Sequence, residues 1–244
     1  NKLFKLNRSL TGKGTQETLR LIKTKIYKLK IYKIKSKTKI FDWTVPAEWN
    51  IKKAYIEDLN KKKIINFSNN NLHLVGYSAP TKKTLTKKNL LKYIHTNKRI
   101  PNAIPYVTSY YKRSWGFCMS HNDLLNLKKE YKNSDKFNIL IDSKFDNNGF
   151  LEYGELVIKG SSKQEILIST YICHPSMANN ELSGPIVAMS LISYFLKKKL
   201  NKTLRFIFIP ETIGSIVYIH KHFEKLRSNV IGGYNISCVG DENK

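Results

Sequence analysis

Cysteine is scarce in this sequence, and long apolar runs are absent from it. Cys118, Cys173 and Cys238 stand far apart in apolar surroundings. Their number and spacing argue against a disulfide framework and a Cys-x-x-Cys metal site, and indicate reduced thiols. No run approaches the about 18 apolar residues that a membrane-spanning helix needs, and no charged-then-apolar leader is visible. We therefore expect a cytoplasmic protein without a membrane partner.

Acidic residues and arginine are also few. The 244 residues include 43 lysines and arginines against 18 acidic residues, a formal charge of +25 that is typical of nucleic-acid-binding proteins. Only six of these basic residues are arginine, however, and lysine comes with much isoleucine and asparagine, a bias that AT-rich coding produces without any ligand. Glycine-rich phosphate loops and RNA-binding aromatic motifs are missing. We predict a diffuse basic surface and no nucleic-acid partner.

Strand-like and helix-like segments alternate in the second half of the chain. The segments EILISTYIC, LRFIFIP and GYNISCVG read as strands, with helices expected at residues 185–198 and 215–226. This alternation predicts an α/β fold with a mixed, mainly parallel sheet flanked by helices. Two earlier strands, KFNILIDSKFD and GFLEYGELVIKG, flank Asn147-Asn148-Gly149. They are expected to form a hairpin at the antiparallel edge of that sheet.

In the first half of the chain, the spacing of apolar residues changes from that of a helix to that of strands. An amphipathic helix is expected from about Thr15 to Leu29, and from Ile31 the pattern approaches the period of two that marks strands. We predict that residues 1–40 belong to the α/β domain, that residues 41–134 form an inserted β-rich α+β domain, and that residues 135–244 continue the α/β domain.

Three of the expected strands are each followed by a residue whose side chain can bind a metal ion or transfer a proton. His174, Glu211 and Asp241 each follow such a strand, and Pro185 stands where the helix after His174 is expected to begin. Because ligands of open α/β sheets bind outside the carboxyl ends of the strands, these three side chains are expected to converge on one cleft.

The residues after His174 resemble a known peptidase motif. The run Asn180-Glu181-Leu182-Ser183-Gly184 is similar to the Asp-Asn-x-Ser-Gly that follows a histidine in two-zinc aminopeptidases of the bacterial leucyl aminopeptidase type. Within that clan, HPSMANNELSGP and PETIGS resemble aminopeptidase-like proteins with an inserted β-rich domain, often encoded beside polysaccharide biosynthesis genes. The resemblance covers nearly the whole chain. It implies zinc-dependent hydrolysis of an amide bond in a small peptide or aminoacyl-like substrate.

The resemblance also implies roles for single residues. His174 matches the first zinc-binding histidine, Asn180 falls on the aspartate that bridges two metals, and Asp241 matches a later aspartate ligand. Glu211 matches the general base. A second histidine ligand is expected beyond Lys244, so the sequence resembles a C-terminally truncated member of the group.

Two departures from the motif weaken the expected zinc site. Asn180 is neutral where the motif has its bridging carboxylate, and Thr212 falls on a metal-binding glutamate. Two divalent ions about 3.5–4 Å apart repel each other unless anionic ligands compensate them. Glu181 could supply a substitute, although it is displaced by one position. The sequence thus predicts weak zinc binding by one ion or none, and no detectable peptide hydrolysis by these 244 residues.

Further candidates for substrate contact come from the same resemblance. Arg8 lies in Asn-Arg-Ser-Leu-Thr-Gly, Arg113 and Trp115 lie in YKRSWGFC, and Glu181 of the HPSMANNELSGP motif is a further candidate. A guanidinium beside an aromatic ring is a reasonable carboxylate or sugar contact, although a solvated basic loop and a surface stacked pair remain open alternatives. A second function also stays open, namely a catalytically inactive ligand-binding protein that keeps the peptidase fold.

Overall fold

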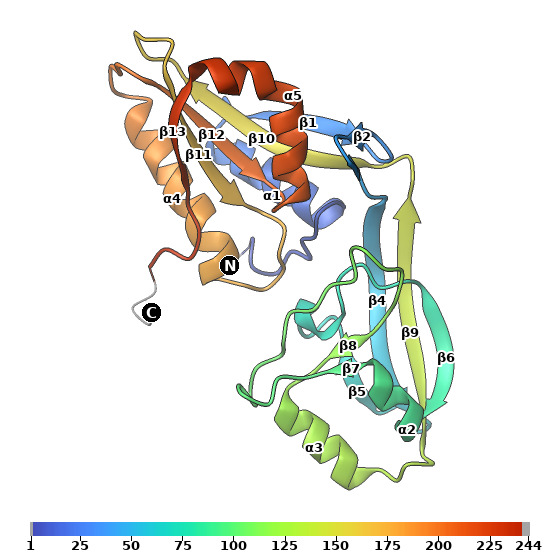
Figure 1. The fold of residues 1–244 in the computed structure, drawn as a ribbon. Coiled ribbons are helices and arrows are strands. Elements are labelled where there is room, and N and C mark those ends of the chain that lie inside the picture. Colours follow the sequence, from blue (N-terminus) through green and yellow to red (C-terminus); the bar gives the residue numbers. More distant parts are fainter. Residues whose placement is uncertain (1, 241–244) are drawn as a thin grey trace. The chain divides into compact units, whose positions relative to one another are not determined.

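The computed structural model describes residues 2–240, which form two compact units (Figure 1). Unit 1 comprises the chain up to Glu48 and from Asp146 onward, and unit 2 comprises Trp49–Phe145. The boundaries therefore fall where two long strands meet unit 1, later than the predicted boundaries at 40/41 and 134/135. The alternation of apolar residues that is typical of strands begins inside unit 1. This pattern therefore does not mark the junction between the two units.

Unit 1 contains both helices and strands in an α/β arrangement, whereas unit 2 consists mostly of strands. The helices are α1 (Lys13–Lys25), α2 (Lys87–Leu90), α3 (His121–Glu130), α4 (Asn179–Phe195) and α5 (Ile213–Asn229), with short 3-10 turns at Asn71–His73 and Leu91–Tyr93. The strands are β1 (Lys30–Lys35), β2 (Lys39–Ile40), β3 (Trp43–Thr44), β4 (Glu48–Asp58), β5 (Lys63–Asn66), β6 (Thr81–Thr86), β7 (Ile94–His95), β8 (Phe117–Cys118), β9 (Lys136–Asp146), β10 (Phe150–Ile158), β11 (Glu165–Tyr171), β12 (Thr203–Ile209) and β13 (Val230–Asn235).

The central sheet of unit 1 is mixed. Its five strands lie in the order β1-β10-β12-β11-β13. The β1–β10 and β10–β12 pairs are antiparallel, whereas β11 runs parallel to both β12 and β13. The α/β fold is thus present, but the prediction of a mainly parallel sheet is not confirmed, because only the half of the sheet nearest the candidate site is parallel.

Helices cover both faces of this sheet (Figure 1). Leu19 of α1, Phe206 of β12 and Ile192 of α4 belong to one buried apolar cluster, so α1 and α4 pack on the same face. Arg205 and Ile207 alternate with Phe206 along β12 and point to the opposite face, where Arg205 contacts α5. A strand buried on both faces is typical of a doubly covered sheet, as the apolar run of β12 indicates.

The expected hairpin across Asn147-Asn148-Gly149 is wrong. β9 pairs with β6 in the sheet of unit 2, whereas β10 pairs with β1 and β12 in unit 1. Gly149 lies against Glu48, where an added Cβ would stand 2.2 Å from the Cβ of Glu48. The Glu48 carboxylate accepts the amide of Phe150 at 3.0 Å. This anchor directs the chain from one sheet to the other instead of reversing it.

Helix α4 begins earlier than predicted. It starts at Asn179, so Pro185 lies inside the helix rather than at its first position. The amides of Leu182 and Ser183 both bond the carbonyl of Ala178, at 2.9 and 3.1 Å. Tertiary contacts of Glu181, described below, stabilise this first turn. They offset the free-energy cost of the backbone hydrogen bond that Pro185 cannot make.

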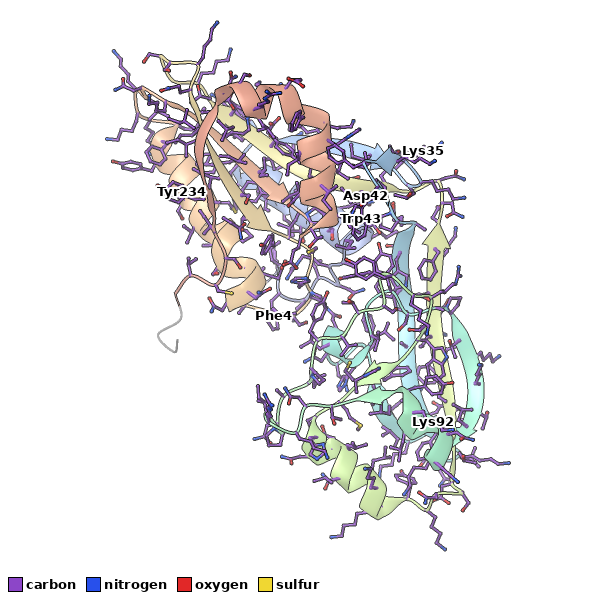
Figure 2. All side chains as sticks on the ribbon, viewed as in Figure 1. Phe4, Lys35, Asp42, Trp43, Lys92 and Tyr234 are labelled. Carbon is purple, nitrogen blue, oxygen red and sulfur yellow. The ribbon has the colours of Figure 1, made fainter. Side chains whose placement is uncertain are left out.

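The final described strand is less buried than its sequence suggests. β13 is exposed over most of its length, and Tyr234 is 68% exposed on it (Figure 2). Within the described residues β13 pairs with β11 alone. The strand ends at Asn235, and Asp241 lies outside the described residues.

Unit 2 is built on a four-stranded sheet in the order β5-β4-β9-β6, beside the two-stranded parallel pair β7-β8. Trp49 stacks on Tyr77 with ring centroids 5.5 Å apart, and its indole nitrogen donates to the carbonyl of Ser78 at 3.0 Å. A large aromatic ring with a satisfied polar group forms an effective core residue. The insertion therefore has an interior of its own.

Lysines project from both units, as Lys35 of unit 1 and Lys92 of unit 2 illustrate (Figure 2). The three cysteines are free, with Cys118 and Cys173 buried and Cys238 exposed. Among residues 2–240, no helix combines the length and the apolar character needed to cross a bilayer.

Candidate active site

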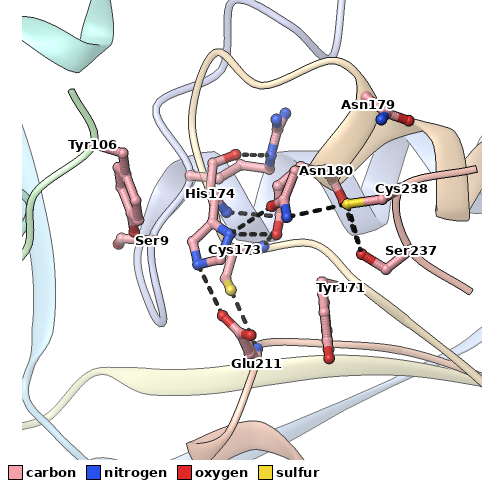
Figure 3. Close-up of polar contacts among 12 residues, drawn as sticks. Ser9, Tyr106, Tyr171, Cys173, His174, Asn179, Asn180, Glu211, Ser237 and Cys238 are labelled. Carbon is pink, nitrogen blue, oxygen red and sulfur yellow. Dashed lines mark hydrogen bonds and ion pairs between the residues drawn. The ribbon is translucent and has the colours of Figure 1, made fainter. Parts of the chain in front are cut away.

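Two predicted site residues meet at the carboxyl edge of the parallel half of the sheet. His174 follows β11 and Glu211 follows β12, and these strands are parallel neighbours. The Nε2 atom of His174 lies 3.1 Å from a carboxylate oxygen of Glu211 (Figure 3). The predicted convergence is therefore observed for this pair. The third member, Asp241, falls outside the described residues.

Glu181 of α4 holds His174 from the other side. Its Oε2 accepts the backbone amides of Cys173 at 2.7 Å and of His174 at 2.9 Å, and its Oε1 lies 2.6 Å from His174 Nδ1. The Glu181 side chain is fully buried. A buried carboxylate is stable only when it is hydrogen-bonded and paired, and these contacts supply both conditions.

Asn180 lies beside the same ring. Its Oδ1 is 3.1 Å from His174 Nδ1, and its side-chain amide points to the sulfur of Cys238 at 3.6 Å (Figure 3). The main-chain carbonyl of Asn180 accepts a bond of 3.4 Å from Ser237. The residue thus stands next to His174, as the motif predicts, but it contributes a neutral amide where the motif has a carboxylate.

Arg8 supports the backbone of the site. Its Nε donates to the carbonyl of His174 at 2.9 Å and its Nη1 to the carbonyl of Leu3, and Arg8 is only 1% exposed. Burial lowers the pKa of Arg8, while the charge of Glu181 opposes that decrease. The guanidinium is held inside unit 1, and its predicted contact with substrate stays a prediction.

Cys173 is a site residue that the sequence interpretation did not include. Its buried sulfur accepts the amide of Glu211 at 3.2 Å and so ties the end of β12 to the end of β11. Burial raises the pKa of the Cys173 thiol, which keeps it protonated and unreactive. The signal was its position immediately before His174, but a buried strand-end cysteine is usually a packing residue.

The charge of the neighbours decides the protonation of His174. Burial lowers its pKa, but hydrogen bonds and charges of Cys173 and Glu181 outweigh burial and raise the pKa above its ordinary value. Because the Cys173 thiol is itself held neutral by burial, the Glu181 carboxylate is the group that sustains this shift.

The donor set fits one divalent ion better than two. A hydrogen-bond acceptor on Nδ1 of a histidine is the arrangement that presents Nε2 to zinc, and Asn180 Oδ1 supplies it for His174 at 3.1 Å, with the Glu181 carboxylate also 2.6 Å from Nδ1. The remaining donors for a second ion are poor, because Asn180 is neutral and Thr212 offers a single exposed hydroxyl. A two-zinc site therefore does not fit the described residues.

A different trio could be mistaken for a metal centre. Ligand atoms of Cys173, His174 and Glu181 all lie within 4.8 Å of one another. The Cys173 sulfur is buried and bonded to the amide of Glu211, and Glu181 is occupied by backbone amides. These contacts make the trio a scaffold behind the ring of His174 rather than an open coordination site.

The two candidates from the insertion lie in unit 2. Arg113 stacks over the ring of Phe145, with 4.6 Å from its guanidinium carbon to the ring centroid. Trp115 stacks on Tyr93 with ring centroids 3.9 Å apart. Both side chains are thus engaged within their own unit, and a role in substrate contact stays a prediction for each of them.

Solved structures define the class of fold. The chain matches a crystal structure from Clostridium acetobutylicum, provisionally titled a peptidase, with a TM-score of 0.92 and 43% identity over 99% of this chain and 55% of that one. It also matches a zinc aminopeptidase from Bacillus subtilis (TM-score 0.63, 13% identity, 96% of this chain and 65% of that one). A peptidase M28 precursor from Shewanella amazonensis matches with a TM-score of 0.61 and 13% identity over 95% of this chain and 67% of that one. The fold is that of the zinc aminopeptidases.

The family follows from sequence. Residues 1–244 match the model described as "Domain of unknown function (DUF4910)", and the chain belongs to this family. A curated Clostridium acetobutylicum relative, provisionally named a polysaccharide biosynthesis protein with an aminopeptidase-like domain, is 43% identical over 240 residues, which are 98% of this chain and 54% of the relative. The chain thus spans about half the length of this relative.

Proposed function

We propose that the protein is a metal-dependent, aminopeptidase-like hydrolase that cleaves an amide bond with one zinc ion. The observation that carries this proposal is the pair formed by His174 Nε2 and the Glu211 carboxylate, 3.1 Å apart at the carboxyl edge of two parallel strands. Zinc-aminopeptidase-like folds among the structural relatives support the same reading.

Glu211 is the general base of this proposal. Its side chain is 42% exposed, so water can reach the carboxylate, whereas the neighbouring His174 side chain is 11% exposed. Glu211 takes a proton from the attacking water and delivers it to the leaving amine. A zinc ion, when bound, supplies Lewis acidity and brings the pKa of its water to about 7. Since Cys173 bonds the amide of Glu211, the base is held in place by its backbone.

The proposed ligands are His174 Nε2 and Asp241, the carboxylate that the resemblance assigns, whereas Asn180 Oδ1 contacts Nδ1 on the other edge of the ring. This set is short of anionic charge compared with a two-ion site. We therefore expect the protein to lose its ion during purification and to need added zinc for turnover.

The substrate class follows from the reaction and the relatives. A small peptide or an aminoacyl amide is the simplest substrate for an aminopeptidase-like site. The link of the Clostridium relative to polysaccharide biosynthesis adds amides of amino sugars, which present the same carbonyl group to the base.

Hydrolysis of an aminoacyl anilide and N-acyl amino sugar panel, with zinc in excess, tests this proposal. Because excess zinc offsets the weak binding that led the sequence to predict no detectable hydrolysis, we expect turnover that requires zinc and falls by about 10²–10⁴-fold in Glu211→Gln, the range of general-base catalysis. Glu224→Gln, which removes an exposed carboxylate from α5, is the matched control and should retain the wild-type rate.

Absence of turnover with every substrate at saturating zinc would contradict hydrolysis. Binding of an aminoacyl amide under those conditions, with equal affinity in Glu211→Gln, would then support the inactive ligand-binding protein instead.

A further inference from the structure

We propose that unit 1 carries a second binding site, for a small phosphate ester that bears hydroxyl groups, at the edge of the sheet opposite His174 and Glu211. The site is a hollow of about 580 Å³, a volume within the range of about 300–1,000 Å³ that is usual for small-molecule sites. Arg205, which lines it, is the third residue of β12, whereas Glu211 follows the carboxyl end of that strand. The hollow is therefore separate from the candidate active site.

Charged side chains form the floor of this hollow, on the face of the sheet that packs against α5. Glu155 of β10 stands opposite Lys30 of β1 in the strand register. Arg205 of β12 stands opposite Val157 of β10. The Arg205 and Glu155 side chains are 2% and 7% exposed, and they form an ion pair with each other. A buried ion pair contributes little net stability compared with apolar residues of similar volume, so stability alone does not account for this pair on a strand as apolar as β12.

Four lysines form the rim of the hollow. They come from the turn before β1, from β1 itself, from the position after β10 and from α5, and they are Lys28, Lys30, Lys159 and Lys225. The fold gathers them, because they do not form a run in the sequence. Even when Glu165, which also pairs with Arg205, is counted with Glu155, five cations stand against two carboxylates. The hollow therefore has an excess of positive charge, which favours an anionic ligand.

The lining residues indicate the chemistry of that ligand. Lysine commonly binds phosphate, and a phosphate ester of charge about −1.5 to −2 at pH 7 balances most of the excess. Val157 is 37% exposed although it lies on an inner strand, and with Tyr32 it offers an apolar wall to the body of the ligand.

Glu155 favours hydroxyl groups on the same ligand. Its Oε1 accepts hydrogen bonds from Arg205 and Tyr218. A carboxylate has about four acceptor positions, so Glu155 can also accept hydroxyl groups from a ligand in the hollow. A sugar phosphate combines the anion, the hydroxyl groups and the compact body that this lining fits.

Calorimetric titration with glucose 1-phosphate, in a buffer free of phosphate, tests this inference. We expect one equivalent to bind saturably, and inorganic phosphate and glucose each to bind more weakly. Lys30→Gln and Lys159→Gln should each weaken binding by about tenfold or more, the effect of losing one hydrogen bond to a charged group. Lys35→Gln is the matched control, because Lys35 is an exposed lysine of β1 outside the hollow, and it should bind like wild type.

His174→Gln separates this site from the proposed active site, and it should bind glucose 1-phosphate with wild-type affinity. Three results would overturn the inference: no saturable binding to wild type, equal weakening in Lys35→Gln and Lys30→Gln, or loss of binding in His174→Gln. Equal affinity for inorganic phosphate and glucose 1-phosphate would overturn the assignment of a hydroxyl-bearing ligand. None of these measurements depends on turnover, so an inactive protein that binds as expected would contradict the proposed function alone.

Discussion

Arg205→Met should strongly destabilise unit 1. Arg205 is 2% exposed and makes a bidentate contact with Glu165, at 2.5 and 3.0 Å, as well as an ion pair with Glu155. Tyr218 donates to Glu155 at 2.6 Å. Removal of the guanidinium leaves two nearly buried carboxylates facing a methyl group, so the cost arises from uncompensated charge rather than from lost volume.

The expected loss is about 3–5 kcal/mol, the range measured when one partner of a buried ion pair is removed. At about 2–4 °C per kcal/mol for chains of this size, the melting temperature should fall by roughly 6–20 °C. Arg20→Met is the matched control, because Arg20 lies 3.8 Å from Glu17 with both side chains about half exposed. An exposed pair contributes about 0–1 kcal/mol.

The pH dependence of the stability difference between wild type and Arg205→Met tests whether uncompensated charge causes the destabilisation. Burial raises the pKa of Glu155 and Glu165, but hydrogen bonds and the charge of Arg205 outweigh it and hold each pKa below 4.5. A lowered folded-state pKa stabilises the fold above the unfolded-state pKa, and this contribution disappears as the pH falls through the folded-state values. In Arg205→Met only the weaker remaining contacts oppose burial, from Tyr218 at Glu155 and from Lys225 and Asn229 at Glu165, so both pKa values should rise. The difference in stability should thus shrink between pH 7 and about pH 4.

Calorimetric or fluorescence melting at both pH values provides the assay. Adding Glu165→Gln to Arg205→Met should recover part of the loss, because it removes one uncompensated charge. An Arg205→Met protein that melts within about 2 °C of wild type at pH 7, which is less than 1 kcal/mol, would refute the reasoning.

Two further predictions concern packing and surface charge. Gly184→Ala should destabilise unit 1 by about 1–3 kcal/mol, measured by thermal melting. The cause is that the added Cβ would stand 2.2 Å from the carbonyl oxygen of Ile236. Gly232→Ala is the control and should melt like wild type, because a Cβ added there would have no atom within 4 Å. An unchanged melting temperature in Gly184→Ala would contradict the close approach. Binding to random duplex DNA should be weaker than micromolar at physiological salt, and sub-micromolar binding with a steep linear fall of log affinity against log salt would contradict the diffuse basic surface.

Local pattern was sufficient for β11 and β12 and for the edge of the sheet that carries the site. The apolar runs of β11 and β12 predicted buried parallel strands of one sheet, and the carboxyl-edge rule then predicted that His174 and Glu211 share a cleft. That inference needed no knowledge of side-chain packing, because parallel strands share one direction.

Pairing between distant segments could not be predicted in the same way. β10 follows β9 directly, yet its partners are β1 and β12. The turn residues between β9 and β10 favoured a hairpin, and only the tertiary contact of Glu48 with the amide of Phe150 shows why the chain continues into another sheet.

The role of Glu181 was equally hidden from the sequence. Its position in the motif suggested a substitute metal ligand, whereas the early start of α4 directs its carboxylate at the backbone of Cys173 and the ring of His174. Pro185 concealed that early start, because proline is common in the first turn of helices and disfavoured further inside. A single misplaced helix start therefore changed the function inferred for one residue.

Zinc titration of the metal-free protein, with stoichiometry from calorimetry, tests the central claim most directly. We predict one equivalent of zinc in wild type and none in His174→Gln, because Nε2 of His174 is the proposed anchor and the described donors beside it do not support a second ion. Two equivalents in wild type, or one equivalent retained in His174→Gln, would contradict the one-ion site at His174.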